Sequence, residues 1–201
     1  DLEQFVEAAA SRHILMFSTD PSMQEGLRAT PVGGALRPPG SEGDLLSVVV
    51  NSAAGSKVDF YQDRDLRYAI DLQSDGFGVA DLDVMLRNDA PTSGQPGYVI
   101  GPARSEDAGS VLQHVQAGES VALVNAYCGT DCVPVERRAG DGPLRTVGSK
   151  TDLGVRYEQR YVPIRSGKEH TFEFSWADPT AWEGNSSGGV YRMTFANQVT
   201  V

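Results

Sequence analysis

The regular alternation of apolar and polar residues is the feature that most restricts what this chain can fold into. Residues 66–73 alternate in this way, residues 79–87 do so again, and Asp75 and Gly76 lie between the two segments. Because successive side chains of a strand point to opposite faces, each segment is predicted to be a strand with one apolar face. An Asp-Gly pair favours a tight turn. The pattern therefore predicts a β-hairpin with one solvated face.

Further strands are expected downstream, between stretches rich in Gly, Pro, Asp and Ser. The loop at residues 165–168 has the composition of a strand connection, and residues 177–189, with Trp182 and a Ser-Ser-Gly-Gly run, predict a mobile loop. Several short strands joined by turns are typical of a β-sandwich. The expected strands are residues 98–100, 111–115, 120–127, 155–164, 171–176 and 190–195.

The first 60 residues follow a different pattern. Apolar residues at helical spacing predict a helix that ends near Ser11, and an apolar strand is expected at residues 13–17. Asp20 before Pro21 provides an N-cap and a first-turn proline, which predicts a second helix to about Arg28. A Gly- and Pro-rich loop then leads to a valine-rich strand at residues 45–51.

Together the two patterns predict an α+β fold. A short α/β segment, residues 1–60, would pack with a C-terminal antiparallel β-sandwich, residues 61–201, of the immunoglobulin-like kind. The 201 residues, 40% hydrophobic and 22% charged, are ordinary for a globular protein with a real core. The chain opens on Asp1 with neither an initiator Met nor a signal peptide, so we expect residues 1–60 to be the end of a larger upstream domain.

Charge restricts the partners. The chain has 17 Lys and Arg against 27 Asp and Glu, and the formal net charge of -10 would repel nucleic acid and anionic head groups. Apolar runs are strand-sized, far below the roughly 18 residues that span a bilayer, so no membrane insertion of this segment is expected. Solubility is the ordinary reason for such acidity, and a cation-dependent surface function is the alternative.

Cys128 and Cys132 are the only cysteines, and we predict that they form a small surface disulfide loop. Gly129 gives the backbone the freedom to bring the two Cα atoms close enough, and the loop would fix a strand end. Two free core thiols, a redox pair and a zinc half-site are the alternatives; redox pairs usually have two intervening residues, and zinc needs further ligands. A disulfide implies an oxidising compartment.

No catalytic residue, metal site or cofactor is predicted. His13, His114 and His170 share no ligand spacing, and no Gly-x-Ser-x-Gly elbow or phosphate-binding loop occurs. A calcium site is the alternative reading of the acidic positions, but their spacing is not that of an EF-hand loop. Local ion pairing or a solvated strand face explains them more simply. These acidic positions are Asp59, Asp63, Asp65, Asp81 and Asp83.

Short motifs over nearly the whole chain resemble a family of actinobacterial envelope-associated proteins, grouped as the domain of unknown function numbered 4012. The resemblance implies a single-pass membrane protein, with this chain as its extracytoplasmic, carboxy-terminal part at the cell surface and its anchor outside this chain. It implies no activity and no catalytic residue. The motifs are Arg12-His13-Ile14-Leu15, Ser18-Thr19-Asp20, Gly34-Ala35-Leu36, Val48-Val49-Val50-Asn51, Lys57-Val58-Asp59-Phe60-Tyr61, Leu86-Arg87-Asn88 and Pro96-Gly97-Tyr98-Val99.

Three hypotheses for function follow. The first is a non-enzymatic extracytoplasmic cell-envelope module that binds a cell-wall glycan or an envelope protein through loops at one end of the sandwich. Trp182, Tyr61 and Tyr98 are its candidate ligand-binding residues, because aromatic rings can stack on sugars. The second is an enzyme acting on envelope polysaccharide or peptidoglycan, with paired carboxylates drawn from Asp59, Asp63 or Glu183. The third is a structural spacer in a surface complex.

Overall fold

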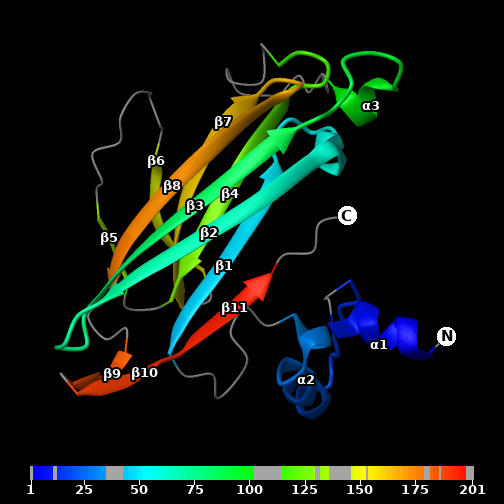
Figure 1. Cartoon of the computed structure of the whole chain (residues 1–201). Coiled ribbons are helices and arrows are strands. Elements are labelled where there is room, and N and C mark those ends of the chain that lie inside the picture. Colours follow the sequence, from blue (N-terminus) through cyan, green and yellow to red (C-terminus); the bar gives the residue numbers. More distant parts are fainter. Residues whose placement is uncertain are drawn as a thin grey trace.

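A computed structural model describes residues 2–10, 13–34, 43–101, 115–129, 132–135, 146–152, 154–178, 182–185 and 187–197. Nearly half of these residues form two β-sheets that face each other (Figure 1). The predicted α+β class with an antiparallel β-sandwich is confirmed.

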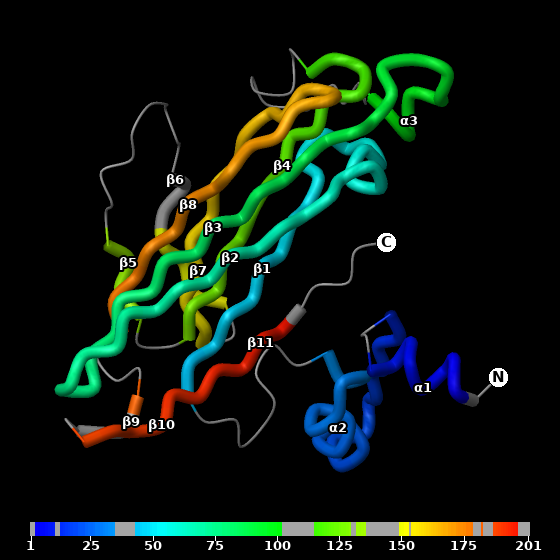
Figure 2. The backbone as a smooth tube through the Cα atoms, viewed as in Figure 1, coloured from blue at the N-terminus to red at the C-terminus, as the bar shows by residue number. Residues whose placement is uncertain are grey.

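The first sheet has five strands in the order β11-β1-β4-β7-β6. The pairing of β11 with β1 is parallel, whereas β1 with β4, β4 with β7 and β6 with β7 are antiparallel. Figure 2 follows β1 and β11 side by side. The strands are β1 (Asp44–Ser52), β4 (Ser120–Cys128), β6 (Thr146–Asp152), β7 (Val155–Ile164) and β11 (Met193–Asn197).

The second sheet has four strands in the order β2-β3-β8-β5, all paired antiparallel. Its strands β2 and β3 are the predicted hairpin. The side chains of Leu82, Val84 and Leu86 are buried between the sheets, with Phe172, Phe174 and Trp176 of β8 beside them in the same core. The strands are β2 (Gln62–Leu72), β3 (Gly78–Asn88), β5 (Val133–Pro134) and β8 (Lys168–Asp178).

Both predicted helices are confirmed. Helix α1 covers Leu2–Ala10 and α2 covers Pro21–Arg28, where the Asp20 carboxylate accepts a hydrogen bond from the Met23 N–H at 2.8 Å. The short 3₁₀ turn η1 (Pro31–Gly33) follows. In Figure 1 these helices lie to the side of the sandwich, beyond β11. No helix in the described part of the chain is long and apolar enough to cross a membrane.

The prediction of a strand at residues 13–17 is wrong, because this segment pairs with no strand in the described part of the chain. Its backbone contact with η1 is a single hydrogen bond, from Met16 N–H to Val32 C=O. Strand β1 is confirmed where it was expected, and it lies inside the five-stranded sheet. The five-stranded sheet thus begins before residue 60, whereas an upstream domain stays a prediction.

Four further expectations are corrected or untested. Residues 98–100 form a helical turn, α3 (Gly97–Ile100), because Pro96 starts the turn and Gly101 ends it at a positive φ of 70°. Residues 177–189 are not one loop: β8 runs to Asp178, and β9 (Trp182–Asn185) pairs with β10 (Gly188–Tyr191). The strand expected at residues 190–195 is interrupted at Arg192, between β10 and β11. Residues 111–114 lie outside the described part of the chain.

The predicted disulfide between Cys128 and Cys132 is present, with Cα atoms 5.9 Å apart. Cys128 ends β4, as expected for a link that fixes a strand end. The bridge is not on the surface, however, since the cysteines are 1% and 0% exposed and belong to the main core. It lies where the chain leaves the five-stranded sheet and enters β5 of the other sheet.

Candidate functional site

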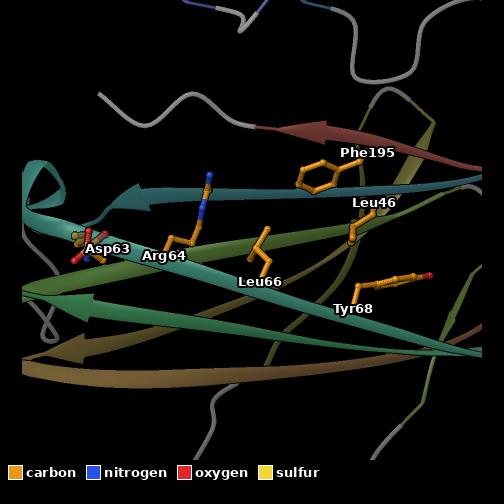
Figure 3. A pocket seen from close by; sticks show the side chains of 7 residues that line it. Leu46, Asp63, Arg64, Leu66, Tyr68 and Phe195 are labelled. Atoms are coloured by element: carbon orange, nitrogen blue, oxygen red, sulfur yellow. The ribbon is translucent and has the colours of Figure 1, made fainter.

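A groove of about 620 Å³ opens along one side of the sandwich, between β2 of one sheet and β1 and β11 of the other (Figure 3). Both β2 and β11 are the outermost strands of their sheets, so the space between them is not closed by a further strand of the described chain. The groove is lined by Leu46, Gln62, Asp63, Arg64, Leu66, Tyr68 and Phe195.

Apolar and aromatic side chains form much of the groove wall. Leu46 belongs to the main core, and Leu66 and Tyr68 are partly buried against that core. Phe195 is 49% exposed although it lies on a strand, which leaves much of the side chain accessible in the groove. Sites for small organic ligands are typically concave, with apolar walls and a few polar groups, and this groove has the same character.

The polar groups of the groove come from three consecutive residues at the start of β2. Gln62 donates a hydrogen bond to the Ser120 hydroxyl, and Arg64 donates a long one, 3.4 Å, to the Val48 carbonyl. Figure 3 shows Arg64 reaching from β2 toward β1. Burial lowers the pKa of Arg64, because the cation has lost part of its water. A partly desolvated guanidinium favours interaction with an anionic or hydroxyl-rich ligand.

At one end of the groove, Tyr68 belongs to a partly buried hydrogen-bond network. The Tyr68 hydroxyl lies 3.1 Å from a carboxylate oxygen of Asp44, the Tyr191 hydroxyl lies 3.0 Å from the same oxygen, and the two hydroxyls are 3.1 Å apart. Burial is the main cause that raises the pKa of Asp44 and of both tyrosines. The network ties β1, β2 and β10 together and fixes the Tyr68 ring in the groove.

The aromatic residues proposed from sequence do not meet at one place. Trp182 packs on the turn after β2, where its indole N–H donates to the Gln73 carbonyl at 2.7 Å. Tyr61, in the 3₁₀ turn η2 (Val58–Tyr61), and Tyr98, in α3, lie at the other end of β2, where Lys57 N–H donates to Val99 C=O. The eleven residues of β2 separate the two ends, roughly 35 Å at the usual rise per residue.

Two other tyrosines do meet, on the outer face of the five-stranded sheet, and a third lies further along the same face. Tyr127 of β4 stacks on Tyr157 of β7 with ring centroids 4.8 Å apart. Tyr161 follows on the same face of β7, opposite Leu123. Between them the Gln159 amide donates to Asn125 at 2.8 Å. Tyr127 is only 8% exposed, so its ring offers little surface to a ligand, and we place the candidate site in the groove.

The acidic residues proposed for catalysis are divided as well. Asp63 lines the groove and Asp59 lies in η2 at the same end of β2. Glu183 follows Trp182 in β9, whose backbone bonds to Gly76 at the far end of the hairpin. Glycosidases need carboxyl groups within about 10 Å of each other. The strand that carries Glu183 lies at the opposite end of the hairpin from Asp59 and Asp63.

A second cavity, of about 340 Å³, lies at the end of the sandwich where β7 and β8 are connected. It is lined by His170 and by charged residues of both signs, among them Glu119 and Lys168. Burial lowers the pKa of His170, whose ring packs edge-on against Phe172. Glu119 accepts a hydrogen bond from Gln116 N–H in its own turn. Within the described residues, no group of three or more His, Cys, Asp and Glu is arranged to hold a metal ion.

Sequence reasoning missed the main groove residues, Arg64 and Phe195. The sequence did contain a signal for Arg64, because its side chain lies on the same inward face of β2 as Leu66, Tyr68 and Ile70. No comparable signal marks Phe195, because its place in the groove depends on β11 returning beside β1.

Comparison of the chain with family models, with curated proteins and with solved structures gave no significant match. The resemblance to the envelope-associated family therefore stays a prediction, and the site is interpreted from its geometry alone.

Proposed function

We propose that this chain is a non-enzymatic module of the cell envelope that binds a glycan in the groove between β2 and β11. The observation that carries the proposal is the combination, in one groove, of Phe195 and Tyr68 with the side chains of Gln62, Asp63 and Arg64. In this proposal the groove residues bind the ligand, in place of Trp182, Tyr61 and Tyr98.

The chemistry of a sugar matches this lining. A pyranose ring has apolar C–H faces that pack on aromatic rings, and hydroxyl groups at its rim that both donate and accept hydrogen bonds. The amide of Gln62 can do both, the Asp63 carboxylate accepts, and the Arg64 guanidinium donates through several N–H groups. Arg64 also favours sugars that carry a carboxylate or phosphate.

The location outside the cytoplasm rests on separate grounds. The Cys128–Cys132 bridge supports an oxidising compartment, because cytosolic thiols are normally kept reduced. The resemblance to envelope proteins points the same way. An envelope protein partner is the competing ligand, and the binding experiment separates the two.

The test is binding to isolated envelope polysaccharide, measured by affinity electrophoresis with Phe195→Ala and Arg64→Gln. Each variant is expected to weaken binding about tenfold, since a ring contact contributes about 0.5 to 1.5 kcal/mol and a charge-assisted hydrogen bond about 1.5 or more. Phe60→Ala is the matched control, because Phe60 is 65% exposed and does not line the groove.

Trp182→Ala is expected to leave polysaccharide binding unchanged. Wild-type protein that is not retarded by any polysaccharide would overturn the glycan assignment and favour the protein partner. Equal loss in the Phe195 and Phe60 variants would remove the groove as the site.

A further inference from the structure

The second cavity, of about 340 Å³ at the turn between β7 and β8, has charged groups of both signs in its walls. It shares no lining residue with the groove in which we place glycan binding. Its size is at the lower end of the range for small-molecule sites. The lining residues are Glu119, Pro163, Ile164, Arg165, Lys168, Glu169 and His170.

Two cationic residues of this cavity are the first and last residues of one turn. The Lys168 N–H closes the turn by donating to the Arg165 C=O at 3.0 Å. The turn is also held from outside, because the Gly167 N–H donates to the Asn88 C=O at 2.7 Å. Since the ends of such a turn lie within about 7 Å of each other, Arg165 and Lys168 can contact the same ligand group.

A carboxylate, that of Glu119, lines the same cavity from a second turn. Its Oε2 atom accepts a hydrogen bond from the Gln116 N–H at 3.0 Å, and the Glu119 N–H donates to the Gln116 C=O at 3.0 Å. The two bonds fix the position of the carboxylate. Because a carboxylate accepts several hydrogen bonds, Glu119 can still accept one from a ligand.

The opposite charges of the cavity do not neutralise each other. Within the described part of the chain, no ion pair joins Glu119 to Arg165 or Lys168, although all three line one cavity. The side chain of Glu169 alternates to the other face of β8 from that of Lys168, and in the sheet Glu169 lies opposite Arg87. The cavity therefore has two cations and one carboxylate available for a ligand.

The rest of the wall is apolar and aromatic. Ile164 belongs to the main core and Pro163 precedes it, while the His170 ring packs edge-on against Phe172. Burial lowers the pKa of His170, so the ring is uncharged at neutral pH and adds no third cation. This part of the wall suits an aliphatic group of a ligand.

We propose that this cavity binds a small zwitterion, an α-amino acid with an aliphatic side chain. Its carboxylate accepts charge-assisted hydrogen bonds from Arg165 and Lys168, and its ammonium group donates to Glu119. Its side chain packs on Pro163 and Ile164. A zwitterion satisfies both signs of charge, whereas a simple anion is repelled by Glu119 and a simple cation by the two cationic residues. The proposal does not depend on glycan binding in the groove.

The test is isothermal titration calorimetry of the full chain with L-leucine and two analogues of nearly the same shape. 4-Methylpentanoate lacks the ammonium group, and 3-methylbutylamine lacks the carboxylate. Each analogue is expected to bind wild type about tenfold more weakly than leucine, because it loses charge-assisted hydrogen bonds. A wild-type chain that does not bind leucine overturns the proposal. So does 4-methylpentanoate that binds as tightly as leucine, since the cavity would then recognise only an anion.

Two variants test the roles of the charged groups. Glu119→Gln is expected to weaken leucine binding about tenfold, because the ammonium group loses its carboxylate. The same variant should bind 4-methylpentanoate at least as tightly as wild type does, since a group that repels the anion has been removed. Lys168→Gln should weaken the binding of leucine and of 4-methylpentanoate alike.

Glu169→Gln and Lys150→Gln are the matched controls and should bind leucine like wild type. The first makes the same change as Glu119→Gln on the other face of β8. The second removes a lysine that donates to Gln159 at 3.0 Å and does not line the cavity. Circular dichroism checks that each variant is folded. Equal losses in Glu119→Gln and Glu169→Gln overturn the proposal, as does a Glu119→Gln variant that binds both leucine and 4-methylpentanoate more weakly.

Discussion

Asp44 shows how a single buried side chain supports the candidate site. It is 4% exposed, accepts a hydrogen bond from the Leu45 N–H, and lies within hydrogen-bond distance of the hydroxyls of Tyr68 and Tyr191. Burial raises its pKa, and the hydrogen bonds only partly oppose this. The folded state therefore binds the Asp44 proton more tightly than the unfolded state does.

This difference predicts the direction of a pH effect. Because the folded pKa of Asp44 is above the ordinary value of 3.8, its contribution to the free energy of unfolding is largest below pH 3.8 and is lost as pH rises through the folded pKa. Asp44→Asn, which does not titrate, lacks this loss. Urea unfolding at a series of pH values should show wild-type stability falling relative to the variant as pH rises.

The comparison with the variant is necessary because burial raises the pKa of Glu158 too. Glu158 therefore also makes the wild-type free energy of unfolding fall as pH rises. The difference between wild type and Asp44→Asn removes that common term. A difference that is constant from acid to neutral pH would contradict the assignment.

At the scale of elements, the side chain of Asn88 links the end of β3 to the segments next to it in the other sheet. It is fully buried, its amide donates to the carbonyls of Gly118 and Ile164 at 2.8 Å, and its carbonyl accepts from Ala90 N–H. One side chain thus connects the four-stranded sheet to the ends of β4 and β7 in the other sheet.

Asn88→Ala is expected to lower the free energy of unfolding by about 2 to 4 kcal/mol, because two buried carbonyls lose their donor and each unsatisfied group costs about 1 kcal/mol or more. Denaturant unfolding measures the change. Asn51→Ala, at an exposed position of β1, is the control and should stay within about 0.5 kcal/mol of wild type. Similar losses in both variants would argue against the bridging role.

The elements that sequence predicted well are those specified by local patterns. The hairpin of β2 and β3 follows from alternation and an Asp-Gly turn, and α2 follows from Asp20 and Pro21. Predictions failed where distant contacts decide the backbone. Residues 177–189 were expected to be a loop, but Trp182 binds the turn at Gln73 and Gly76 and β9 pairs with β10.

At the scale of the whole molecule, the disulfide links the end of β4 in one sheet to the residue that precedes β5 in the other. Replacing both cysteines by alanine, Cys128→Ala with Cys132→Ala, should lower the free energy of unfolding by about 2 kcal/mol, the chain-entropy value for so short a loop. The sandwich should still form, because the core between the sheets extends well beyond the two cysteines. Thermal unfolding of wild type with and without reductant, beside the variant, measures the effect. An unfolded variant would show that the bridge is essential to the fold.

The sequence by itself determined the α+β class, the β2–β3 hairpin, the α2 cap and the cysteine pair, because each depends on side chains close together in the chain. Only the tertiary structure decided that β2 and β11 are edge strands and that Arg64, Tyr68 and Phe195 line one groove. The parallel return of β11 beside β1 joins segments far apart in sequence. Alternation specifies which face of a strand is buried but not which strand lies beside it, so neither the groove nor the open edge of β2 can be read from the residues alone.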